Sequence, residues 1–227
     1  MSTPSPSDPA DIVPVLDRLI DETVATLRAD PVFGRIFDGT ASRELYLRYL
    51  TQTYHYVKQT RLQLQAGARA LRDHADPGRR ALGQRFAHHE QEEIGHEQWV
   101  LDDIRALGGD ADAAAREEPG AAVKAYLAMG AFVWQSRHPL GLMGVGTLLE
   151  GISEQLGSST AKNLAERSGI PSIEAALSFL RSHGEADVGH MEEARAALRR
   201  VEDPREKEVI VLCARMTSLY YTHLLHP

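Results

Sequence analysis

Cysteine is nearly absent from this sequence: Cys213 is the single thiol among 227 residues. One thiol excludes an internal disulfide, which fits a reducing compartment such as the cytoplasm. No apolar run approaches the roughly 18–20 residues that a membrane span needs, and no cationic start precedes an apolar signal core. We therefore expect a cytoplasmic protein that does not enter a membrane.

The chain has no excess of positive charge. The formal net charge is −7, from 25 Lys and Arg against 32 Asp and Glu, and the basic residues form no cluster. This balance argues against a nucleic-acid partner. The opening MSTPSPSDPAD is typical of a disordered lead, so we predict a lead over residues 1–9 and one domain over residues 10–227.

Alternation of apolar and polar residues, which would indicate β-strands, is missing over any useful length. Apolar residues instead recur at steps of three and four, as in Ile12, Leu16, Leu19, Ile20, Val24 and Leu27. Breaks at Asp76–Gly78, Gly108–Gly109, His138–Pro139 and Pro171 separate the periodic segments. We predict an all-α bundle of about seven helices, including one over 42–71 and a single helix from about residue 79 to Gly108.

The segment FAHHEQEEIGHEQW, residues 86–99, contains three histidines and four glutamates. His89, Glu93 and His96 are spaced i, i+4 and i+7, which places them on one helix face. His88, Glu90 and Glu97 point elsewhere. A polar surface face would also explain this segment alone, so its meaning depends on matching residues elsewhere.

A second segment, FLRSHGEADVGHMEEA, repeats the spacing with His183, Asp187 and His190. Apolar residues such as Phe179 and Leu180 flank this face, so the three polar side chains are expected beside the core. Burying ionisable groups without partners is strongly unfavourable. They need one another, another charged group or a cation.

A third segment, HPLGLMGVGTLLEGISEQLG, is apolar for most of its length and then presents Glu150 among Gly, Leu and Ile. A lone glutamate in such a helix is hard to explain as surface. Gly141, Gly144 and Gly146 would allow another helix, or a substrate, to approach closely.

Three imidazoles and three carboxylates thus come from three predicted helices. A mixture of nitrogen and oxygen donors without thiolate suits iron or manganese and disfavours a structural zinc site. Carboxylate–histidine sets inside helix bundles commonly hold two iron ions. We therefore predict a metal centre formed by Glu93, His96, Glu150, His183, Asp187 and His190.

The order Glu-x-x-His, then a glutamate, then His-x3-Asp-x2-His resembles the haem-oxygenase-like di-iron oxidases and oxygenases. These iron-containing redox enzymes share a fold with thiaminase II and pyrroloquinoline quinone synthase. EEIGHEQWVLDDIRALG, HPLGLMGVGTLLEG and FLRSHGEADVGH carry the resemblance, which extends over most of the chain after about residue 40.

The resemblance implies that the six residues bind two Fe(II) ions. It also implies that the protein uses O2 to oxidise a small amine, amino acid or carboxylic acid, by N-oxygenation, desaturation or C–C cleavage. Homodimers are common among such bundles. The segment SLYYTHLL therefore packs either inside the domain or against a second subunit.

The sequence departs from this family in one respect. Such sites commonly take a further carboxylate from the long second helix, but the segment 49–71 contains no Asp or Glu. His55 or Gln59 could fill the place, and His89 is a further candidate. Otherwise the second iron would bind weakly, or only when a substrate brings its own carboxylate.

Other functions remain open at this point. Arg137 is a candidate partner for a substrate carboxylate. A non-catalytic or single-metal binding protein of the same fold is the main alternative. A thiaminase-like hydrolase would need Cys213 as nucleophile, in a segment that favours inert packing. A haem oxygenase would need a histidine near the start of the chain, and the first 54 residues contain none.

Overall fold

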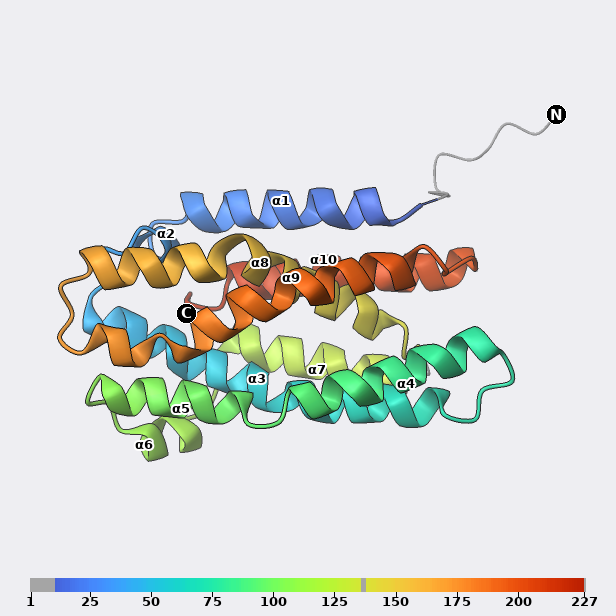
Figure 1. The fold of residues 1–227 in the computed structure, drawn as a ribbon, viewed down its shortest axis with the longest axis horizontal. Coiled ribbons are helices and arrows are strands. Elements are labelled where there is room, and N and C mark those ends of the chain that lie inside the picture. The colour runs from blue at the N-terminus through green and yellow to red at the C-terminus, as the bar shows by residue number, and fades with distance from the viewer. Residues whose placement is uncertain (1–10, 136–137, 227) are drawn as a thin grey trace.

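The computed structural model describes residues 11–135 and 138–226, without the side chains of 134–135 and 185–188. The predicted lead over 1–9 lies outside the described residues. Every regular element in the described part is helical, which confirms the all-α prediction (Figure 1). The elements are α1 (Val13–Ala29), α2 (Phe33–Phe37), α3 (Arg43–Leu71), α4 (Pro77–Glu92), α5 (His96–Ala106), α6 (Ala111–Arg116), α7 (Ala121–Gln135), α8 (Gly141–Arg167), η1 (Ile173–Ala176), α9 (Ser178–Leu198) and α10 (Pro204–Thr222).

Helix starts follow the local sequence. The Ser42 side chain accepts a hydrogen bond from the Leu45 amide at the start of α3. Asp76 and Asp203 cap α4 and α10 in the same way, each followed by a proline in the first turn. Such side chains satisfy amide groups that have no partner within the helix.

One predicted helix is wrong. The segment expected to run unbroken to Gly108 is two helices, α4 and α5, separated by Glu93–Gly95. Gly95 has φ +90°, a left-handed backbone conformation that residues other than glycine rarely adopt. The chain therefore changes direction here, between the end of α4 and the start of α5. The two helices lie almost end to end in Figure 1.

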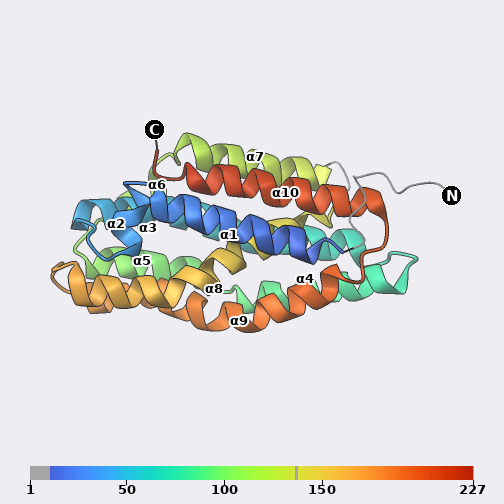
Figure 2. The same ribbon diagram turned by 90° about the horizontal axis from the view of Figure 1, so that it is seen from above.

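The long helix α8 lies at the centre of the packing and contacts α1, α9 and α10. The α3 helix packs against α4, α5 and α7. Seen from above, α7 and α10 form one side of the bundle and α4 and α9 form the other (Figure 2). In the last segment, Tyr221, Leu224 and Leu225 are buried in the core, whereas Leu219 is 57% exposed. None of the described helices is long and apolar enough to cross a membrane.

Two close helix crossings depend on glycine. At Gly144, a Cβ atom would lie 2.0 Å from the carbonyl oxygen of Ile210, so the backbones of α8 and α10 approach directly. At Gly157, a Cβ atom would lie 2.9 Å from the Cα of Gly184, which brings α8 against α9. The prediction that glycines in α8 allow close approach of another helix is confirmed at Gly144.

We predict that Gly144→Ala lowers the free energy of unfolding by roughly 1–3 kcal/mol, because the methyl group meets backbone rather than a movable side chain. Gly189→Ala, on the α9 helix, is the matched control. A Cβ there meets nothing within 4 Å, so this variant should gain roughly 0.5–1 kcal/mol from helix propensity. Urea unfolding of both variants measures the difference, and equal stabilities would contradict the close-crossing argument.

Candidate metal centre

Two groups of donor atoms lie where α4, α5, α8 and α9 meet. The first consists of His89, Glu150 and His190, and the second of Glu93, His96 and His183. Within each group the donor atoms all lie within 4.8 Å of one another. Five of the six predicted ligands are therefore brought together, and His89 joins them. The side chain of the sixth, Asp187, lies outside the described residues.

The break between α4 and α5 shapes the second group. Glu93 directly follows the last residue of α4, and His96 is the first residue of α5. Oε2 of Glu93 lies 2.9 Å from Nδ1 of His96. The His96 ring stacks on Trp99 with a centroid distance of 4.2 Å, which fixes the orientation of the imidazole.

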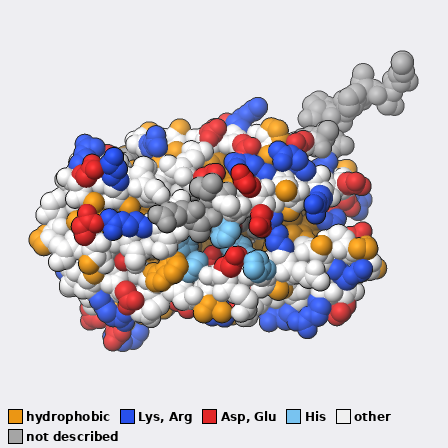
Figure 3. Space-filling view, in the orientation of Figure 1, with side chains coloured by type: hydrophobic (Ala, Val, Ile, Leu, Met, Phe, Trp, Pro, Cys, Tyr) orange, Lys and Arg blue, Asp and Glu red, His pale blue; other side chains and the backbone are white. Residues whose placement is uncertain are grey.

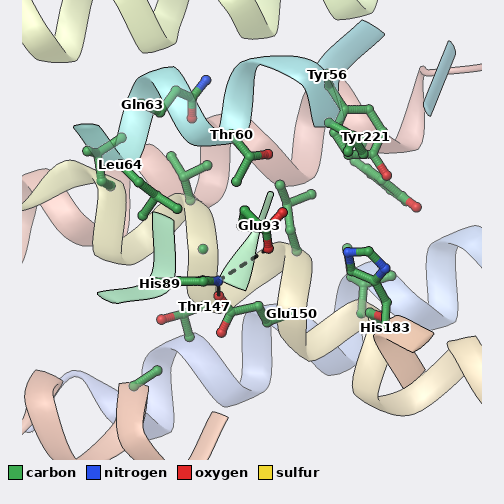
Figure 4. Close-up of a pocket in the computed structure, with 18 of the residues that line it drawn as sticks. Tyr56, Thr60, Gln63, Leu64, His89, Glu93, Thr147, Glu150, His183 and Tyr221 are labelled. Atoms are coloured by element: carbon green, nitrogen blue, oxygen red, sulfur yellow. Dashed lines mark ion pairs between the residues drawn. The ribbon is translucent and has the colours of Figure 1, made fainter. Parts of the chain in front are cut away.

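Glu93 also contacts the first group. Its Oε1 lies 3.3 Å from Nε2 of His89, while its other oxygen faces His96. The same His89 nitrogen lies 3.8 Å from Oε1 of Glu150 (Figure 4). One carboxylate therefore lies between the two groups, in the position that a bridging ligand would occupy.

Hydrogen bonding decides which nitrogen of His183 carries the proton. Its Nδ1 lies 3.1 Å from the carbonyl oxygen of Phe179. A carbonyl can only accept, so Nδ1 must donate, and in the neutral ring Nε2 then holds the lone pair. A backbone carbonyl in this role orients metal-binding histidines in many proteins.

A metal ion fits this arrangement. Nε2 of His89 and Nδ1 of His96 are both buried, and neither makes a hydrogen bond of acceptable geometry. Carboxylate oxygens nevertheless lie 3.3 Å and 2.9 Å from these nitrogens. Buried nitrogens that converge on carboxylates without hydrogen bonds are the pattern expected when donors share a cation. The nitrogen and oxygen donors suit iron.

Burial and charge act against each other on the pKa values here. Burial raises the pKa of Glu93, but contacts with His89 and His96 outweigh it, and the pKa is lowered. Burial lowers the pKa of His89, but the carboxylates of Glu93 and Glu150 outweigh it and raise the pKa. Without a metal, the site is therefore stabilised by charge pairing between the imidazole and the carboxylates.

Asp103 of α5 holds the start of α9 in place. It is fully buried, and its carboxylate accepts hydrogen bonds from the Ser178 amide (3.1 Å), the Ser178 hydroxyl (2.6 Å) and the Phe179 amide (3.0 Å). It thus caps a helix whose own N-terminal residue provides no side-chain cap. This cap connects the helix that carries His96 with the helix that carries His183.

Beside the donors lies a cavity of about 140 Å³. His89, Glu93, Glu150 and His183 form part of its wall (Figure 4). The rest of the wall is mostly apolar or tyrosine, including Phe37, Tyr49, Tyr56, Leu64, Phe86, Tyr126, Leu142, Met143, Ile152, Leu156, Phe179, Leu180 and Tyr221. In the space-filling view, histidines and acidic side chains meet in a hollow on the surface (Figure 3). The cavity can therefore hold an organic molecule next to the donor groups.

The other candidate residues lie elsewhere. His55 is 1% exposed, its Nδ1 is 3.2 Å from Nζ of Lys58, and burial and Lys58 lower its pKa. Neither His55 nor Gln59 is among the cavity-wall residues, so the structure does not support either as the replacement for the missing carboxylate. Arg137 lies outside the described residues. His89, the further candidate from the sequence, lies in the first donor group.

Solved structures with the same architecture identify the fold. A domain of unknown function with a heme oxygenase-like fold from Shewanella denitrificans matches with a TM-score of 0.79 and 20% identity, covering 95% of this chain and 90% of that chain. A TenA homologue from Pseudomonas syringae pv. tomato matches with a TM-score of 0.77 and 13% identity, covering 99% of this chain and 97% of that chain. A TenA homologue from P. horikoshii matches with a TM-score of 0.70 and 12% identity, covering 94% of this chain and 98% of that chain. The chain has the haem-oxygenase-like fold.

The chain belongs to the family of iron-containing redox enzymes, whose sequence pattern matches residues 47–222. No curated protein matches the sequence. The family resemblance seen in the sequence motifs is thereby confirmed, and it makes iron the expected metal.

We predict that Asp103→Ala lowers the free energy of unfolding by roughly 1–3 kcal/mol, because the buried amides of Ser178 and Phe179 lose their acceptor. Asp103→Asn should lower the free energy of unfolding by less, since the side-chain amide keeps one acceptor oxygen. Thermal or urea unfolding of the two metal-free variants tests this, and an alanine variant as stable as wild type would show that the cap is dispensable.

We also predict that metal binding releases protons at neutral pH. The raised pKa leaves a fraction of His89 protonated, and a cation must displace that proton, so apparent affinity should increase as pH rises through the pKa and then level off. Co(II) titration calorimetry in buffers of different ionisation enthalpy measures the release. His89→Gln should reduce it, and the exposed His223→Gln is the control; equal release in both variants would contradict the assignment.

Proposed function

We propose that this protein is a non-haem di-iron oxidase or oxygenase that uses O2 to oxidise a small amine, amino acid or carboxylic acid. The observation that carries the proposal is the pair of nitrogen–oxygen donor groups, joined through Glu93. They contribute His89, Glu93, Glu150 and His183 to the wall of one largely apolar cavity. Membership of an iron-containing redox family supports iron as the cofactor.

His89, Glu150 and His190 would hold one iron ion, and Glu93, His96 and His183 the other, with Asp187 as a predicted further ligand. Bound iron would supply the electrons for reaction with O2. The protein itself orients the donors: Trp99 fixes the His96 ring, and the Phe179 carbonyl keeps the proton of His183 on Nδ1. The apolar wall excludes water from the space in which the substrate would lie.

Arg85 is a candidate contact for the substrate. It is the one Lys or Arg among the described wall residues, and it lies one helical turn before His89 on α4. Its Nη2 donates to the carbonyl of His190 at 3.3 Å and lies 3.8 Å from the exposed Glu193. A substrate carboxylate would be held beside the first donor group if it paired with Arg85.

The TenA homologues among the similar structures make a thiaminase-like hydrolase the second candidate. That reaction needs a reactive thiol in the cavity. Cys213 is buried in an apolar cluster with Tyr126, Met129, Val133 and Val145. Tyr126 and Val145 also line the cavity, but Cys213 itself is not part of the cavity wall. Burial raises its pKa to about 11, which suppresses the thiolate. These observations favour the redox function.

Anaerobic Fe(II) titration of the metal-free protein, followed by O2-uptake measurements with amines and carboxylic acids, tests the proposal. We expect about two irons per chain and O2 consumption that depends on iron and increases with a suitable substrate. His183→Ala should lose one iron and the O2 consumption, because it removes a donor from the second group. His223→Ala should bind as much iron and consume as much O2 as wild type.

A wild-type chain that binds no iron would refute the oxidase proposal. One iron per chain without O2 consumption would instead favour the alternative, a single-metal or non-catalytic binding protein of the same fold. Hydrolysis of a thiamin-like substrate by the metal-free protein, lost in Cys213→Ser, would favour the hydrolase.

A further inference from the structure

Threonine hydroxyls inside helices commonly donate a hydrogen bond to the carbonyl oxygen four residues earlier in the chain. Several threonines of the described helices do so, with oxygen–oxygen distances from 2.6 to 3.0 Å. They are Thr23, Thr26, Thr51, Thr217 and Thr222. None of them belongs to the cavity wall. At these positions away from the cavity, the helix backbone satisfies the hydroxyl.

Two threonines of α8, Thr147 and Thr160, do not follow this pattern. Both belong to the cavity wall, and they are only 3% and 1% exposed. Neither hydroxyl makes a hydrogen bond with any described residue. The one other buried threonine hydroxyl of the described chain without such a bond is that of Thr53, which interacts with the hydroxyls of Tyr49 and Tyr56. The two unpaired hydroxyls of α8 therefore coincide with the cavity.

An unpaired buried hydroxyl lowers the stability of a protein, because it gives up its hydrogen bonds to water without a replacement. Valine has nearly the same shape as threonine and carries no polar group, so it would fill either position without this cost. Buried polar groups without a partner in a native protein therefore call for an explanation. A ligand that enters the cavity and forms hydrogen bonds with the two hydroxyls provides one.

The two threonines are well separated along the cavity wall. Thr147 precedes Glu150 of the first donor group by one turn of α8 (Figure 4). Thr160 lies further along the same helix, about 20 Å from Thr147 as measured along the helix. On α8, Glu150 is the only charged residue of the wall. One hydroxyl is therefore close to the donors, and the other is far from them.

A hydroxyl both donates and accepts hydrogen bonds, so it suits a neutral partner such as a hydroxyl, carbonyl or amide group. Threonine populates two χ1 rotamers in a helix. Rotation about the Cα–Cβ bond is therefore sufficient to turn the hydroxyl of a cavity-wall threonine toward a molecule in the cavity.

We propose that Thr147 and Thr160 bind the substrate, an elongated and mostly apolar molecule with a hydrogen-bonding group at each end. Thr147 contacts the end next to Glu150, and Thr160 binds a neutral hydroxyl, carbonyl or amide group at the far end. This inference rests on the proposed function, since it takes the cavity as the substrate site. It narrows the substrate to molecules with a second polar group, remote from the donors.

Calorimetric titration of the full-length, metal-free protein with α,ω-alkanediols, and with alkanols of the same chain length, tests the proposal. A diol has one hydroxyl for each threonine, whereas an alkanol has a hydroxyl for only one of them. We expect the best-fitting diol to bind roughly fivefold more tightly than its alkanol, the effect of about one hydrogen bond. Thr147→Val and Thr160→Val should each remove this preference. Thr160→Ser should keep it, because serine retains the hydroxyl.

Thr217→Val is the matched control. Thr217 is also 1% exposed, but its hydroxyl donates to the Cys213 carbonyl at 2.8 Å, and it is not part of the cavity wall. This variant should keep the diol preference and should unfold at a lower urea concentration than wild type, because a hydrogen bond is lost. Thr147→Val and Thr160→Val should unfold at the same or a higher urea concentration than wild type, because they lose no hydrogen bond.

Equal binding of diol and alkanol by wild type, or no binding of either, would overturn the proposal. An unchanged diol preference in Thr160→Val would overturn it too. The same holds if Thr147→Val and Thr160→Val are as destabilised as Thr217→Val, since their hydroxyls would then have partners within the protein.

Failure of the proposed function gives a different result, because the titration needs no metal. A chain that shows the diol preference but binds no iron refutes the oxidase and keeps the two polar contacts. A chain that binds iron and consumes O2 but shows no diol preference refutes the two contacts alone.

Discussion

The carboxylate of Glu93 lies between the imidazoles of His89 and His96, and the surrounding helices are arranged so that this contact can form. A buried carboxylate is costly unless it is paired, and here the pairing outweighs the cost and lowers its pKa. The pairing requires α4 to stop at Glu92 and α5 to start at His96, with Gly95 in the left-handed conformation between them. The helix break is therefore a feature of the site rather than a defect of the helix.

The remaining donors depend on packing at some distance from the candidate metal site. Glu150 is presented by α8, whose glycines allow α9 and α10 to approach its backbone. His183 depends on α9, whose first turn is fixed by Asp103 from α5. Close backbone contact therefore positions a donor of the first group, and a side-chain cap positions a donor of the second. The glycine contacts and the cap each fix how two helices pack, and this packing brings their polar side chains together.

Much of the helical fold and many of the donor residues could be predicted from the sequence, because helical periodicity is a local property. The spacing of His89, Glu93 and His96, and of His183 and His190, identified the faces that meet in the structure. The break at Gly95 was missed, since a lone glycine inside a periodic segment is often tolerated in a helix. The role of Asp103 could not be foreseen. It depends on which residues of α9 lie opposite α5, and that is fixed by tertiary packing.

The Asp103 cap also shows when, during synthesis of the chain, the parts of the site can come together. Ser178 and its acceptor are separated by 75 residues, and the two donor groups likewise combine α4 and α5 with α9. A chain emerging from the ribosome exposes the first histidines and glutamates long before α9 has been synthesised. Neither donor group is complete until α9 has packed against α8. A metal ion at either group could therefore be held by all of that group's donors only after α9 has been translated.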